Sequence, residues 1–216
     1  MILVKPSFEI LAVSQNPLSL IELAGRTCYK SEDKITDESA KKFVESITRR
    51  GHHSVIEHAF ITVKVVCDRG VTHEIVRHRL CSFSQESTRY CNYKGGVTFV
   101  IPPWVSYKEG RYEDHPSESD YDAFGVGSCM WFTSVLRAER GYQKLLDANW
   151  SPQQARSVLP NSTKTEIVIT ANVREWRHIF TLRCHKASHP QMNEIMRPIH
   201  QECKKLIPVI FDDIEY

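Results

Sequence analysis

The pattern of apolar and polar positions along the chain predicts a mixture of strands and helices. Residues 2–13 and 60–67 are predicted to be strands, the second because it alternates and is rich in β-branched side chains. Two further strands are expected over residues 97–101 and 165–173, the first of them stopped by two prolines. These segments supply the strands of at least one sheet.

Helices are predicted where apolar residues recur every three or four positions behind a capping residue. Asn16 followed by Pro17 predicts one helix start, and Asp37 predicts the next, which Gly51 ends. Further helices are expected over residues 72–79, 119–149, 175–184 and 191–206, with a short one after Pro152. Since the order lacks a regular β-α-β repeat, we expect one α+β domain over residues 1–216, with a central, partly antiparallel sheet flanked by helices.

Composition excludes several classes of protein. With Lys+Arg 28 and Asp+Glu 26, the net charge of +2 gives no basic excess for nonspecific nucleic-acid binding. No apolar stretch approaches the roughly 18 residues of a membrane span, and no secretory signal is visible. The seven cysteines form no CxxC pairs and indicate reduced thiols. We therefore expect a cytoplasmic protein, in the host cytoplasm if it is virally encoded, that acts neither on nucleic acid nor at a membrane.

Positive charge is nevertheless concentrated in two segments. Residues 174–189 carry four Lys or Arg against one Glu, and residues 77–79 read Arg-His-Arg with Arg89 nearby. Local positive charge in a near-neutral chain favours a compact anionic ligand over a long polyanion. Arginine forks and the serine hydroxyls between residues 77 and 90 suit a phosphate. From spacing alone, this segment is either an anion site or a solvated helix end, and both interpretations stay open.

Other kinds of site have weaker support. His185 and His189 lie four residues apart beside Cys184, but the intervening Ala-Ser and the following proline predict a loop without further ligands at short spacing. The GxxxxGK and GxGxxG signatures are absent. We therefore predict no metal site. Two rival hypotheses stay open, namely a nucleotide- or RNA-phosphate-binding module and a zinc-dependent nucleotide hydrolase.

The segment Arg77-His78-Arg79, followed after seven residues by Ser87, matches RHR-x7-S, and in this the chain resembles the flavin-dependent thymidylate synthases. The resemblance extends through residues 51–58, 155–160, 172–174, 182–183 and 189–191. It implies a homotetrameric enzyme, with sites shared between subunits, that methylates dUMP at C5 to dTMP. 5,10-Methylenetetrahydrofolate would be the carbon donor and NADPH the reductant, acting through FAD. The flavin would perform the hydride chemistry, and the protein would supply position and electrostatics.

The resemblance also implies roles for individual side chains. Those expected to bind dUMP are Glu74, Arg77, Gln85, Glu86, Ser87, Thr88, Arg89, Arg156 and Arg183. Those expected to bind FAD are His52, Ser54, Glu57, Arg77, His78, Arg79, Gln85, Asn172, Arg174 and His178. Arg183 is the expected catalytic residue, because a cation over the pyrimidine favours uracil deprotonated at N3.

Three positions depart from the residues that are usual in the family. Ser84 and His178 stand where the family often has Asn, and Gln85 stands where many members have Glu. We therefore expect altered ribose contacts and a flavin site that responds to pH. Cys81 and Ser87 have no base suitably placed beside them, so we expect no covalent bond between a side chain and dUMP.

Overall fold

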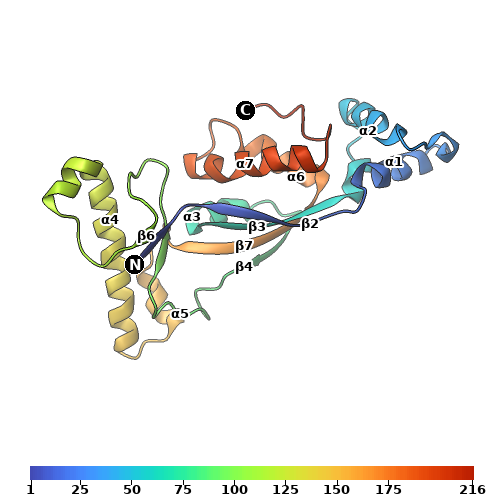
Figure 1. Ribbon diagram of the computed structural model, residues 1–216. Coiled ribbons are helices and arrows are strands. Elements are labelled where there is room, and N and C mark those ends of the chain that lie inside the picture. Colours follow the sequence, from blue (N-terminus) through green and yellow to red (C-terminus); the bar gives the residue numbers. More distant parts are fainter. The chain divides into compact units, whose positions relative to one another are not determined.

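The computed structural model describes residues 1–216 and divides them into two compact units. Unit 1 consists of Met1–Ser7, Val66–Ile75 and Ser84–Ile167, and unit 2 consists of Phe8–Val65, Val76–Phe83 and Val168–Tyr216. Each unit contains both helices and strands (Figure 1). The α+β class is therefore confirmed, whereas a single domain over residues 1–216 stays a prediction.

The strands form two sheets instead of the one central sheet that we expected. They are β1 (Ile2–Val4), β2 (Ser7–Val13), β3 (Phe60–Asp68), β4 (Ser82–Gln85), β5 (Thr98–Val100), β6 (Gly110–Arg111) and β7 (Lys164–Asn172). One sheet has the order β5-β1-β6, with β1 parallel to β5 and antiparallel to β6; the other has the order β2-β3-β7-β4. The predicted strand over residues 2–13 is thus two strands in different sheets, interrupted at Pro6, which has no N–H to donate.

The helices largely follow the predicted pattern. They are α1 (Pro17–Thr27), α2 (Ser39–Arg49), α3 (Arg69–Ile75), α4 (Glu118–Asp147), α5 (Pro152–Ala155), α6 (Val173–Arg183) and α7 (Pro190–Leu206), with 3-10 turns η1 (Glu32–Lys34), η2 (Val55–His58) and η3 (Arg156–Val158). Helix α3 begins and ends earlier than predicted, and α2 follows Glu38, so Asp37 was wrong as its cap. Asn16 does precede α1, but with left-handed backbone and no side-chain cap. None of the helices is both long and apolar enough to cross a membrane.

The core of unit 1 lies between its three-stranded sheet and α4. Its buried side chains include Leu3, Val97, Phe99, Ile101, Cys129, Phe132, Val135, Leu136 and Tyr142. Tyr142 Oη accepts a hydrogen bond from the N–H of Tyr93 at 3.3 Å, and Gln143 Nε2 donates to the carbonyl of Tyr93 at 2.8 Å. These bonds attach the segment that follows β4 to the buried core.

In unit 2, α6 packs against strand β3 through a buried tryptophan. Trp176 is fully buried, stacks on Phe180 at 5.4 Å between ring centroids, and donates from Nε1 to the carbonyl of Ile61 at 3.0 Å. Helices α6 and α7 lie together over this strand (Figure 1). The buried contacts of Trp176 fix α6, and Arg174 and His178 of the same helix remain exposed.

Candidate functional site

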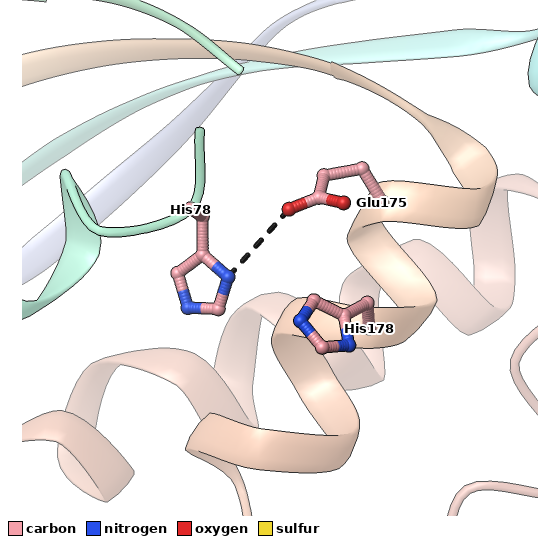
Figure 2. Close-up of side chains that lie close together, drawn as sticks. All are labelled: His78, Glu175 and His178. Carbon is pink, nitrogen blue, oxygen red and sulfur yellow. Dashed lines mark ion pairs between the residues drawn. The ribbon is translucent and has the colours of Figure 1, made fainter. Parts of the chain in front are cut away.

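His78 lies within a small cluster of polar side chains in unit 2 (Figure 2). It belongs to the loop after α3 and is 5% exposed, and it faces Glu175 and His178 of α6. Arg183 Nε donates to His78 Nε2 at 2.9 Å, while His78 Nδ1 lies 3.6 Å from Glu175 Oε1. The rings of His78 and His178 meet edge to face, with their centroids 5.6 Å apart.

These contacts determine the protonation of His78. A guanidinium only donates hydrogen bonds, so His78 Nε2 must accept and Nδ1 must carry the ring proton that faces Glu175. Burial, followed by the charges of Arg183 and His178, lowers the pKa of His78 from 6.5 to about 4. Burial also raises the pKa of Glu175 above its ordinary value. At neutral pH, therefore, His78 is a neutral imidazole in one fixed tautomer.

The same cluster resembles a metal site but does not fit one. The candidate ligand atoms of His78, Glu175 and His178 all lie within 4.8 Å of one another. A metal at His78 Nδ1 would move the ring proton to Nε2, where it would meet the N–H of Arg183 Nε. Because two donors would then face each other, the bond from Arg183 opposes a metal here.

A cavity of about 540 Å³ opens beside this cluster in unit 2. Its lining consists of Glu57, Leu80, Asn172, Arg174, Glu175 and His178. Arg174 Nη1 forms an ion pair with Glu57 Oε1 at 2.5 Å, and Asn172 Oδ1 caps α6 by accepting from the N–H of Glu175 at 2.8 Å. The fold thus brings together at one cavity four residues that the resemblance assigned to FAD, from two separate segments of the chain.

The other residues expected at FAD in unit 2 lie outside this lining. His52 and Ser54 are exposed at the turn between α2 and η2. Arg77 and Arg79 are exposed on either side of the buried His78, in the loop before β4. Their binding roles stay predictions.

In unit 1, the residues expected at dUMP extend from the end of β4 into the following turn. Gln85 Nε2 donates to Thr72 Oγ1 at 3.0 Å and to Thr165 Oγ1 at 3.2 Å, which orients its amide oxygen away from both hydroxyls. Ser87 Oγ accepts from the N–H of Arg89 at 3.3 Å. Gln85 therefore has a structural role within unit 1, in addition to the ligand contact that we predicted.

Glu86 is held by a network that the sequence did not reveal. Its carboxylate accepts from Tyr93 Oη at 2.7 Å and from Lys164 Nζ at 3.0 Å, and Lys164 also pairs with Glu166 at 2.5 Å. The backbone N–H of Glu86 donates to the carbonyl of Glu166 at 2.8 Å. This network fixes the backbone just before Ser87, so Glu86 can position the turn without touching a ligand.

A second cavity, of about 460 Å³, lies in unit 1. Its lining consists of Arg69, His73, Thr88, Gln153, Arg156, Ser157, Leu159, Pro160 and Asn161. Arg156 Nη1 donates to Thr88 Oγ1 at 3.1 Å, so two residues expected at dUMP meet here. Sequence reasoning missed Arg69 and His73, because both lie outside the segments that carry the family resemblance. Glu74 and Arg89 belong to the same unit but lie outside this lining.

Four of the seven thiols are poor nucleophiles. Burial, with a smaller contribution from Glu175, raises the pKa of Cys81 to about 12. Burial likewise raises the pKa of Cys184 and of Cys203 to about 12, and it raises that of Cys67. Since nucleophilic attack needs the thiolate, none of these side chains is activated near neutral pH.

Comparison with known proteins finds similar sequences and a similar solved structure. A family model described as "Thymidylate synthase complementing protein" (Thy1) matches residues 9–209. The flavin-dependent thymidylate synthase of Geobacter sulfurreducens is 32% identical over 213 residues, covering 94% of this chain and 84% of the relative. That of Corynebacterium diphtheriae is 32% identical over 200 residues, covering 91% and 79%. Among solved structures, the UMP/dUMP methylase PolB from Streptomyces cacaoi, bound with 5-Br dUMP, has a TM-score of 0.76 at 28% identity, with 98% of this chain and 96% of that chain covered.

Proposed function

The chain belongs to the family of thymidylate synthase complementing proteins, and from this premise we propose that it is a flavin-dependent thymidylate synthase. It would methylate dUMP at C5 to give dTMP, with 5,10-methylenetetrahydrofolate as the carbon donor and NADPH as the reductant through FAD. The observation that carries this proposal is the unit 2 cavity, where Glu57, Asn172, Arg174 and His178 meet.

The residues around this cavity fit a flavin. Arg174 is 54% exposed at its side chain even though it pairs with Glu57, so its guanidinium stays accessible to a diphosphate. Arg79 provides a second exposed arginine in the same unit. Asn172 and His178 add polar groups suited to the ring edges. Bound FAD would supply the hydride chemistry, and the side chains would hold and orient it.

Arg183 is the proposed catalytic residue. Its Nε is bound to His78 Nε2, and the neutral tautomer of His78 keeps that bond with the guanidinium. The proposal assigns the Nη groups of Arg183 to the pyrimidine, where a cation stabilises uracil deprotonated at N3 and so makes C5 more nucleophilic. His78 then acts as a positioning residue for Arg183.

The test begins with the flavin. Purified protein should show a visible flavin spectrum, or acquire one when FAD is added. It should release tritium from C5-labelled dUMP only when NADPH, the folate donor and FAD are all present. Arg174→Gln should weaken FAD retention, whereas Arg50→Gln, a change at an exposed arginine beyond α2, should not.

A different outcome would overturn the proposal. A colourless protein that ignores FAD and still binds dUMP would support the nucleotide-binding module instead. Arg183→Ala offers a further check, since it should reduce turnover far more than FAD binding. Equal losses in the two would argue against a role at the reacting ring.

We also propose that the active form is a homotetramer with sites shared between subunits, as the family resemblance implies. Sedimentation equilibrium at micromolar concentration should then give the mass of four 25.0 kDa chains. A monomer that is fully active at assay concentration would refute the shared site, because one subunit could then complete it alone.

A further inference from the structure

A carboxylate, that of Glu86, lies inside the segment expected to bind the anionic substrate. Glu86 directly precedes Ser87, Thr88 and Arg89, which the family resemblance assigns to dUMP. The α-carbons of adjacent residues are about 3.8 Å apart, well within the range over which charges interact. If this carboxylate were free to turn toward the nucleotide, it would repel the negative charge of dUMP.

The Glu86 carboxylate is instead held by one donor on each oxygen. Tyr93 Oη donates to Glu86 Oε1 at 2.7 Å, and Lys164 Nζ donates to Glu86 Oε2 at 3.0 Å. The side chains of Lys164 and Glu86 are only 20% and 17% exposed, so solvent screens their ion pair less than it screens a surface pair. With both oxygens bonded, the carboxylate is fixed in one orientation.

The two donors are themselves fixed within unit 1. The N–H of Tyr93 donates at 3.3 Å to the hydroxyl of Tyr142, a residue of the buried core. Lys164 Nζ also donates to Glu166 Oε1 at 2.5 Å, and the carbonyl of Glu166 accepts from the N–H of Glu86 at 2.8 Å. The orientation of the Glu86 carboxylate therefore follows from the fold and needs no ligand.

Both donors keep their protons near neutral pH. Burial raises the pKa of Tyr93, and the hydrogen bond to Glu86 raises it further. Burial opposes the charge of Lys164, but its hydrogen bonds to Glu166 and Glu86 outweigh burial and raise the pKa of Lys164 above its ordinary value. Lys164 therefore keeps the positive charge that offsets the carboxylate.

The lining of the unit 1 cavity agrees with this orientation. Thr88 and Arg156 line the cavity, and Arg156 Nη1 donates to Thr88 Oγ1 at 3.1 Å. Glu86 lies only two residues before Thr88, yet the lining contains neither Glu86 nor any other carboxylate. The bonds from Tyr93 and Lys164 thus hold the carboxylate out of the cavity wall.

We propose that Lys164 and Tyr93 neutralise the Glu86 carboxylate and turn it away, so that residues 87–89 can accept an anionic nucleotide. This inference rests on the proposed function for the identity of the nucleotide. Lys164 and Tyr93 are positioning residues, because they act through Glu86 without touching the substrate. The family resemblance implied no role for either of them.

Two other roles of this network make different predictions. If the Glu86 carboxylate bound the nucleotide directly, Glu86→Gln would weaken dUMP binding. If Lys164 only braced the fold, Lys164→Gln would lower the affinity for every ligand together with the stability. Under our proposal, Glu86→Gln should strengthen dUMP binding, because glutamine keeps an acceptor for Tyr93 and leaves Lys164 one carboxylate fewer to offset.

The experiment compares the affinities for dUMP and deoxyuridine by equilibrium dialysis, with FAD in excess and at low ionic strength. Lys164→Gln should weaken dUMP binding about tenfold and deoxyuridine binding less than about twofold, because only dUMP carries a charge that the freed carboxylate repels. Lys164→Gln/Glu86→Gln should regain most of the lost affinity. Added salt should reduce the difference between Lys164→Gln and the wild type, because it screens the repulsion. Tyr93→Phe should fall between the wild type and Lys164→Gln.

The matched control is an exposed lysine–glutamate pair on α7. Lys205 Nζ donates to Glu202 Oε2 at 2.7 Å, and Lys205→Gln should match the wild type for both ligands, alone or with Glu202→Gln. If the wild type is active but Lys164→Gln loses dUMP and deoxyuridine equally, the masking of Glu86 is wrong and the proposed function stands. The same conclusion follows if Lys164→Gln/Glu86→Gln regains no affinity.

A separate result identifies failure of the proposed function. If the wild type is inactive and binds no dUMP, inorganic phosphate alone becomes the probe. Thermal stabilisation by phosphate that is lost in Lys164→Gln and regained in Lys164→Gln/Glu86→Gln would then support the masking of Glu86 without the proposed function. Equal stabilisation of all three proteins, or of none, would reject it.

Discussion

The neutral state of His78 has a measurable consequence for the pH dependence of folding. Its imidazole is buried, accepts from Arg183, and keeps its pKa near 4, whereas in the unfolded chain the pKa returns to 6.5. Between these values the unfolded chain binds a proton that the folded chain does not. Protonation therefore stabilises the unfolded state, and folding stability falls as the pH drops through this window.

The magnitude follows from the pKa difference of about 2.5, at about 1.4 kcal/mol for each pKa unit. The full loss is about 3.5 kcal/mol and is reached only below about pH 4, and about 2 kcal/mol of it should appear between about pH 7 and pH 5. His78→Gln removes the titration and keeps an acceptor for Arg183. His200, whose pKa burial also lowers, contributes to the pH dependence of both proteins and cancels in the comparison.

The assay is urea unfolding in ligand-free buffer at a series of pH values. The free energy of unfolding of His78→Gln should fall by about 2 kcal/mol less than that of the wild type between about pH 7 and pH 5. His115→Gln is the matched control, because His115 also accepts from an arginine, Arg140, at 2.9 Å but is exposed. The free energy of unfolding of His115→Gln should depend on pH as that of the wild type does. If His78→Gln kept the wild-type pH dependence as well, His78 would be charged in the folded protein and its assigned tautomer would be wrong.

Two further predictions concern the signature segment. Cys81→Ala should keep turnover within a fewfold of wild type in the tritium-release assay, because a thiol with a pKa of about 12 supplies no thiolate; a dUMP adduct that survives denaturation and is lost in this variant would contradict it. Arg79→Ala should mainly weaken FAD retention and Arg89→Ala mainly dUMP binding, each by about 1.5–3 kcal/mol in equilibrium titrations. Equal effects of both variants on both ligands would reject this division of the segment.

Sequence periodicity predicted the strands of the larger sheet better than it predicted the chain's first residues. In β3 and β7, every second side chain is buried, so alternation and β-branching were sufficient to locate them. The N-terminal segment has a similar local pattern, but β1 pairs with β5, almost a hundred residues later. A break set by such a distant partner leaves little trace in the local pattern. Strand β4 was missed because its Ser-Phe-Ser-Gln alternation lies inside the RHR-x7-S segment, which we interpreted as a motif and not as a strand.

In the candidate site, too, local sequence motifs were predictable and contacts between distant segments were not. Motif positions located Glu57, Asn172, Arg174 and His178, which the fold gathers around one cavity. The network of Tyr93 and Lys164 around Glu86 could not be predicted, because its members lie on different segments and have no characteristic spacing. Arg69 was missed for a different reason, since only the structure places it in the lining of the unit 1 cavity.

The two cavities differ in electrostatics in a way that the net charge of +2 conceals. In unit 2, Arg174 is paired with Glu57, and Glu175 adds a buried carboxylate, so the cavity is close to balanced. The flavin ring system of FAD carries little charge, so it loses little hydration free energy on entering such a cavity. The diphosphate of FAD can pair with the exposed arginines of unit 2. In unit 1, Arg69 and Arg156 face a cavity without any carboxylate. A dianion gains most there, because an unopposed cation in a partly desolvated cavity attracts it strongly. The charge distribution therefore suits a flavin in the first cavity and a phosphate monoester in the second. Reversing the charge at Glu57 should disturb flavin binding alone, and reversing it at Arg156 should disturb binding of the phosphate monoester alone.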